Sequence, residues 1–307
     1  MKQLIQKYEK IEPTHIAKVN EILTDYLFAD IRHGSHLPKI RVTVDNASGL
    51  PAVSKDVYGD ILITRHKPGN AFYAELQKVG VSVYVMEDII HKDDNATNEL
   101  SHLENVALAE ELGLKEIESI PESLPKVYKS RSAPCCAVIA VPEPDRLSNV
   151  VTLGDLDRRI YYIFRTRHSE PYSSDLFDIK VKDDKAAKVF TTHMNYSYGG
   201  PLEYDESDAD RISTLRVKAA FKEIKKIAVS SCYGFKPEFI KQVNEAGAQV
   251  YISSGINTES VKLADDLGIT ILGITDYVSH VPFMKRMVEA LRIKGFDAHF
   301  IPRSFLW

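Results

Sequence analysis

Short apolar strands alternate with amphipathic helices at both ends of this chain, and that alternation sharply limits the folds open to it. The period-2 and apolar runs predict strands at residues 40–44, 60–64, 81–86, 226–229, 249–252, 270–274 and 298–301. Helical spacing predicts helices at 71–80, 104–112, 237–246, 259–267 and 281–292. Strands that alternate with helices form mostly parallel sheets covered on both faces, so the α/β class is predicted.

The pattern divides the chain of 307 residues into three parts. Residues 1–119 form a first α/β half, and residues 214–307 form a second. Residues 120–213 are rich in proline, and their strand-like runs have no strong helices between them. We therefore expect a β-rich middle module or insertion, with two mostly parallel α/β halves building one site jointly.

Composition excludes several classes of function. Apolar residues are 44% of the chain, yet no apolar run approaches the roughly 20 residues that a membrane helix needs. The net charge of −4 gives no support to nucleic acid as the main partner. Three cysteines imply no disulfide framework, and the first residues carry no apolar secretory segment, so we expect a protein of the reducing cytoplasm without a membrane partner.

Polar side chains follow several predicted strands, at the place where ligands bind in doubly wound sheets. Arg65 and His66 follow one strand of the first half, and Glu87 and His91 follow the next. In the second half, Asp276 and His280 follow residues 270–274, and Glu259 opens the helix after residues 249–252. Histidine and carboxylate thus recur at equivalent places in both halves, which is how a metal site assembles from distant parts of a sequence.

Each of these residues also has a structural interpretation. Asp276 and His280 are spaced i, i+4 and face the same way only within a helix. The structural interpretation of this pair is a helix N-cap and a surface histidine. His66 can be a satisfied polar residue after a strand, and His91 can belong to a solvated charged loop.

A glycine- and serine-containing turn offers a further candidate site. Residues 230–234 (SSCYG) precede a helix and can present backbone N–H groups to an anion, although they match no established nucleotide-binding pattern. Cys232 lies within this turn, but the sequence shows no matched histidine and asparagine or aspartate, so a nucleophilic role is not supported.

The order of these segments resembles the NIF-three-like family, also described as GTP cyclohydrolase type 2 or dinuclear metal-centre proteins. The resemblance covers roughly residues 38–118 and 216–301. In the first half it rests on VTVDNA with Asp45, ILITRH, GVSVYVMEDIIH and NVALAEELGLKEIE. In the second half it rests on KKIAVSSCYG, EAGAQVYISSG and GITDYVSH.

The resemblance implies a metal centre with an altered set of ligands. The ligand-capable residues at the family's positions are His66, His91, Asp276 and His280. Arg65 replaces one of the family's paired histidines; arginine cannot ligate a metal, but it can bind a phosphate or carboxylate in bidentate fashion. Histidines with carboxylates suit Zn, Mn or Fe, so we expect one or two such ions per chain, with Glu87 or Glu259 as a catalytic base.

Two functions follow from the resemblance. The first is a metal-dependent hydrolase of a small phosphorylated or nucleotide-like substrate, for which GTP ring opening is the named candidate and Arg65 would hold the anion. The second is a non-catalytic metal-binding scaffold or regulator, since family members often assemble as toroidal hexamers. A third interpretation is an α/β binding protein that holds no metal, either for catalysis or as a scaffold.

Overall fold

The computed structural model of the chain describes fourteen stretches of sequence. They are residues 9–10, 37–44, 52–86, 94–120, 137–144, 149–152, 155–156, 159, 188–190, 215–217, 223–231, 237–254, 258–274 and 276–302. At residues 9–10, 94–101, 188–190, 215–217, 254, 258–261, 273 and 276–278 only the backbone is described. Within these stretches no helix is long and apolar enough to cross a membrane.

One sheet is wholly parallel and has the strand order β12-β2-β3-β4. Its strands are β2 (Lys39–Thr43), β3 (Ile61–Thr64), β4 (Ser82–Val85) and β12 (Asp297–Phe300). All four residues of β3 are buried, as expected for an inner strand of a parallel sheet that is covered on both faces. Helix α3 (Asn70–Lys78) connects β3 to β4, and the short helix α2 (Lys55–Tyr58) precedes β3.

The second sheet has six strands in the order β1-β5-β6-β9-β10-β11. Its strands are β1 (Glu9–Lys10), β5 (Leu114–Ile120), β6 (Ala137–Pro142), β9 (Ile227–Ser230), β10 (Val250–Ser254) and β11 (Thr270–Ile274). Strands β9, β10 and β11 are parallel, whereas β1, β5 and β6 join them in antiparallel fashion. The predicted α/β class is confirmed, and in this sheet three antiparallel strands extend the parallel ones.

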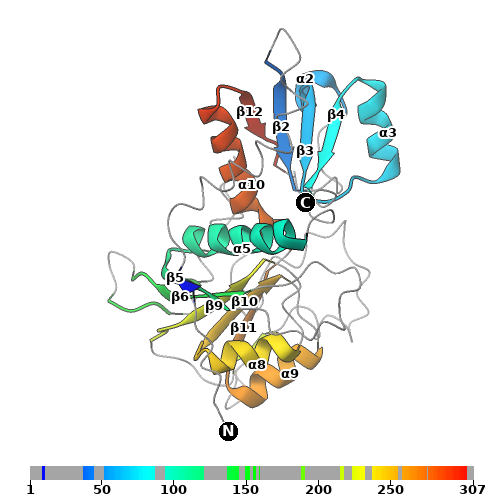
Figure 1. Ribbon diagram of the computed structural model, residues 1–307. Helices are drawn as coiled ribbons and strands as arrows, with labels where there is room; N and C mark the ends of the chain where they lie inside the picture. Colours follow the sequence, from blue (N-terminus) through cyan, green and yellow to red (C-terminus); the bar gives the residue numbers. More distant parts are fainter. Residues whose placement is uncertain are drawn as a thin grey trace, which may run out of the picture.

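Two long helices connect the sheets (Figure 1). Helix α5 (Asp94–Glu111) lies across the six-stranded sheet, on the face opposite α8 (Pro237–Glu245) and α9 (Thr258–Leu267). Helix α10 (Asp276–Ile293) packs against α5, β12 and β2. One apolar cluster therefore runs from the four-stranded sheet through both helices into the six-stranded sheet. A second, smaller cluster contains Tyr58, Leu62, Leu76, Val81 and Ile301.

Strand pairing joins residues from different parts of the three-part division predicted from the sequence. Strand β12 comes from the second half but pairs with β2 of the first, from Asp297 with Lys39 to Phe300 with Val42. Strand β6, from the predicted middle module, pairs with β9 of the second half. Each sheet is therefore built from distant parts of the sequence. A small ribbon likewise pairs β7 (Lys188–Phe190) of the middle zone with β8 (Leu215–Val217), which lies at the start of the second half, and the middle module itself stays a prediction.

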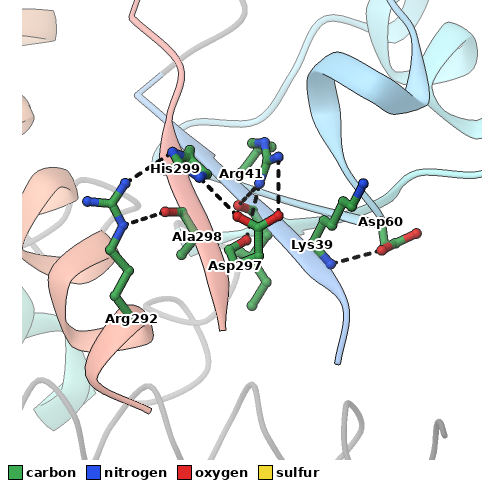
Figure 2. Close-up of polar contacts among 8 residues, drawn as sticks. Lys39, Arg41, Asp60, Arg292, Asp297, Ala298 and His299 are labelled. Atoms are coloured by element: carbon green, nitrogen blue, oxygen red, sulfur yellow. Dashed lines mark hydrogen bonds and ion pairs between the residues drawn. The ribbon is translucent and has the colours of Figure 1, made fainter. Parts of the chain in front are cut away.

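Polar side chains connect the edge strand β12 to strand β2 and helix α10 (Figure 2). Arg41 on β2 donates from Nη1 to the carbonyl of Asp297 at 3.1 Å, and its Nη2 lies 3.7 Å from the Asp297 carboxylate. The same carboxylate lies 2.9 Å from Nε2 of His299, and Arg292 of α10 donates to the carbonyl of Ala298 at 2.7 Å. The end of α10 is thus connected to the sheet that carries Arg65 and His66.

Candidate functional site

The backbone after β3 holds Arg65 and His66 at the carboxyl end of the four-stranded sheet. The N–H of Arg65 donates to the carbonyls of Thr43 and Val44 at 3.3 and 3.1 Å, and the N–H of His66 donates to Val44 at 3.1 Å. These bonds continue the pairing of β2 with β3 beyond the last residues of the strands. Both side chains therefore start from a fixed part of the backbone, as a binding site requires.

Arg65 forms a buried ion pair with Glu104 of α5. Its Nε lies 2.5 Å from Oε1 of Glu104, and its Nη2 lies 3.2 Å from Oε2. Arg65 is 4% exposed, and Glu104 is fully buried. The two parallel N–H donors match the two carboxylate oxygens, which is the strongest geometry available to this pair of side chains.

His280 of α10 joins the same carboxylate from the other side. Its Nδ1 lies 3.1 Å from Oε1 of Glu104, and its side chain is 2% exposed. Its ring also meets the ring of His66 edge to face, with centroids 5.3 Å apart and planes at 74°. Two histidines from opposite ends of the sequence are thereby neighbours, and the interpretation of His280 as a surface histidine is wrong.

The charges around Glu104 decide its ionisation. Burial alone raises the pKa of its carboxyl group, but the positive charge of Arg65, with the neighbouring ring of His280, outweighs burial and lowers the pKa to about 2. Glu104 is therefore ionised at neutral pH, and the Arg65–Glu104 pair carries no net charge as a unit.

Asn105, the next residue along α5, makes a second set of polar contacts beside the site. Asn105 accepts through Oδ1 from the N–H of Ser231 at 2.6 Å and from its hydroxyl at 2.8 Å. The hydroxyl of Ser279 on α10 donates to the carbonyl of Ser231 at 3.1 Å. Asn105, Ser231 and Ser279 are all fully buried. The turn after β9 is thus held by both helices that carry Glu104 and His280.

Two imidazole rings in contact suit a transition metal better than calcium or magnesium, which prefer oxygen ligands. Helix α10 begins at Asp276, so Asp276 stands one helical turn before His280, the helical condition that their i, i+4 spacing requires. The side chain of Asp276 lies outside the described part of the structure. Among the side chains that are described, no three His, Cys, Asp or Glu residues form a group able to hold a metal ion.

The structure thus brings together three of the residues selected from the sequence, Arg65, His66 and His280. Glu87 and His91 lie outside the described residues, as do Asp45 and Cys232. Glu259 lies in the first turn of α9, where only the backbone is described. The ligand and base roles assigned from the resemblance stay predictions. The anion-binding role of Arg65 also stays a prediction, and the structure gives its guanidinium a buried carboxylate partner.

Sequence reasoning missed Glu104 and Asn105. Both lie in the segment HLENVALAEEL, where apolar residues surround them at helical spacing. The buried neighbours Leu103, Val106 and Ala107 flank the pair. A charged residue inside such an apolar stretch is a signal of a buried, paired charge.

The sequence of this chain matches no known protein in two comparisons. No protein-family model matches the sequence. A search of curated proteins also finds no match. Any relationship to known proteins is therefore carried by the three-dimensional structure.

Several solved structures resemble this one, and they are NIF3-family proteins. Protein YbgI, of unknown function, is 12% identical with a TM-score of 0.51, over 94% of this chain and 99% of that chain. Reduced HcgD from Methanocaldococcus jannaschii is 15% identical (TM-score 0.48; 97% and 99% covered). A Bacillus cereus protein related to NIF3 is 14% identical (TM-score 0.46; 97% and 98% covered). The resemblance read from the sequence is thus confirmed as a likeness of fold.

Proposed function

We propose that this chain binds a divalent transition metal at the His66–His280 pair and hydrolyses a small phosphorylated or nucleotide-like substrate there. The observation that carries the proposal is the meeting of these two rings, 5.3 Å apart, from opposite ends of the sequence. Metal-binding histidines characteristically have a carboxylate on their second ring nitrogen, and His280 has Glu104 at 3.1 Å.

The remaining ligands come from residues whose side chains are not described. Asp276 precedes His280 by one turn of α10 and is the closest candidate in sequence, and His91 is the second. One or two ions of Zn, Mn or Fe per chain fit this set of donors. Such an ion supplies a Lewis acid that generates a nucleophile from water near neutral pH.

The protein's own residues then bind and orient. His66 and His280 would hold the ion, and Glu87 or Glu259 would accept a proton as general base. Because the charge of Arg65 is already balanced by Glu104, attraction for an anionic substrate would come chiefly from a bound dication rather than from Arg65. GTP is the first substrate to try, because the family resemblance names its ring opening.

Metal analysis of the purified protein tests the proposal, followed by turnover on a panel of nucleotides with and without a chelator. We expect stoichiometric metal, and we expect His66→Ala and His280→Ala variants to lose metal and turnover while keeping the wild-type far-ultraviolet circular dichroism. Full activity in metal-free protein would refute the proposal. A metal-loaded oligomer without turnover would instead support the non-catalytic scaffold. A hexameric ring and a cytoplasmic location belong to the same proposal and are tested by the mass in solution and by cell fractionation.

A further inference from the structure

Glu104 stands outside the predicted ligand set, yet it connects the cluster. Its Oε1 is shared by Nε of Arg65 at 2.5 Å and Nδ1 of His280 at 3.1 Å, and its Oε2 accepts from Nη2 of Arg65 at 3.2 Å. The carboxylate is fully buried, so water does not compete for these contacts.

The contact with Glu104 decides which nitrogen of His280 carries hydrogen. Nδ1 lies 3.1 Å from Oε1 of Glu104, although the angle at the ring falls short of hydrogen-bond geometry. A bare Nδ1 would direct its lone pair at an anionic oxygen that can only accept, so electrostatic repulsion favours the hydrogen on Nδ1 in both the neutral and the charged ring. In the neutral ring, Nε2 is then left with the lone pair. That tautomer makes Nε2 the atom able to bind a metal or accept a proton.

We propose that Glu104 is a positioning residue that fixes His280 in the Nδ1–H tautomer, with Arg65 as the counter-ion that orients Glu104. The part concerning metal affinity rests on the proposed function above. The bidentate contact with Arg65 holds the carboxylate in one orientation. The carboxylate in turn orients the ring of His280. Arg65 is therefore a structural partner of the site rather than a ligand for the substrate anion.

The tautomer is tested directly, without metal, by nitrogen NMR of the imidazole rings. The comparison is between the wild type and the double variant Arg65→Met with Glu104→Leu, which removes both charges together and leaves neither buried alone. We expect His280 of the wild type to show the Nδ1–H pattern, and the double variant to lose it. An Nε2–H pattern in the wild type overturns the proposal, as does an Nδ1–H pattern that survives in the double variant.

Metal affinity supplies a second measurement. Loss of a carboxylate partner of a metal-bound histidine weakens binding about 10–100-fold, so the double variant should lose affinity by that factor, and Glu104→Gln should also bind more weakly. Glu110→Gln is the matched control, because Glu110 also joins α5 to α10, by an ion pair to Arg286 outside the site. Wild-type affinity in a folded double variant overturns the proposal.

The two proposals fail in different ways. If the wild type binds no metal but shows the Nδ1–H tautomer that depends on Glu104, the proposed function fails and the positioning role stands. If metal binds stoichiometrically and the tautomer does not depend on Glu104, the positioning role fails and the metal site stands. If a variant does not fold, the NMR spectrum of the wild type alone can still overturn the positioning role, because an Nε2–H pattern of His280 contradicts it.

Discussion

Glu104 on α5 and His280 on α10 meet at 3.1 Å inside the protein, and Arg65 holds the same carboxylate from the end of β3. Three elements thus share one buried anion. A buried ion pair of this kind contributes little net stability compared with apolar residues, but breaking it leaves an uncompensated charge. This asymmetry makes the arrangement testable by unfolding experiments.

Arg65→Met should lower the free energy of unfolding by about 3–5 kcal/mol, because Glu104 remains buried without its main counter-charge. The double variant Arg65→Met with Glu104→Leu should recover most of that loss. Urea denaturation followed by circular dichroism measures both. Lys115→Met is the control, since its partner Glu143 is half exposed and the loss should stay under about 1 kcal/mol. Equal losses in the single and double variants would contradict the expectation.

Asn105→Ala should cost about 2–3 kcal/mol, because the buried N–H and hydroxyl of Ser231 lose their acceptor together. Ser231→Ala is the matched control: it removes the hydroxyl bond and keeps the N–H bond to Asn105, so its cost should be about 1 kcal/mol. Thermal unfolding of the two variants gives the comparison. A Ser231→Ala variant less stable than Asn105→Ala would show that this network is assigned incorrectly.

Gly59→Ala should destabilise the protein more than Gly80→Ala. Both glycines have positive φ, 71° and 75°, so both substitutions carry backbone strain. A Cβ at Gly59 would lie within 2.4 Å of the carbonyl oxygen of Lys39 on β2, whereas a Cβ at Gly80 meets nothing within 4 Å. The difference in unfolding free energy between the two variants isolates the clash, and no difference would contradict it.

Tyr58 should make stability fall at alkaline pH. Burial raises the pKa of its hydroxyl from 10.0 to about 12, so the folded protein keeps this proton while the unfolded chain releases it. The contribution is complete below pH 10, the unfolded value, and is lost as pH rises toward 12, by an amount on the order of 2 kcal/mol.

The measurement for Tyr58 is the urea midpoint at increasing pH, compared between the wild type and Tyr58→Phe. Phenylalanine cannot ionise, so the difference between the two curves reports Tyr58 and cancels the other titrating groups. We expect the wild type to lose stability relative to the variant above pH 10. Parallel curves would contradict the assigned pKa.

The sequence predicted many of the strands and helices because each has its own local periodicity. The strand at residues 270–274 matches β11, Thr270–Ile274, and the helix at 71–80 differs from α3, Asn70–Lys78, only at its ends. Strand β5, Leu114–Ile120, was not predicted, since LKEIESI has charged residues and a break in register between Lys115 and Glu118. Strand β5 is stabilised by its pairing with β1 and β6, and a local sequence pattern does not reveal that pairing.

The sequence predicts the site only in part, because it places the first residues of α5 and α10 too late in the chain. The sequence placed the first residue of one helix at Glu104, where a charged side chain would be exposed. Helix α5 begins at Asp94 instead, through polar residues without clear periodicity, so Glu104 lies well inside it. Likewise α10 begins at Asp276 rather than residue 281, which makes His280 a helical, buried residue. Which helix face is buried depends on contacts between α5 and α10 that no local window contains.

The pairing of β12 with β2 has a consequence for synthesis on the ribosome. The four-stranded sheet needs residues 297–300 beside residues 39–42, so it cannot be completed while the nascent chain ends before β12. Such distant pairing raises the contact order and the entropy cost of loop closure, which slows folding. The sheet that carries Arg65 and His66 is therefore complete only after β12 is made, and a chain truncated before residue 297 should leave β2 as an open edge that invites aggregation.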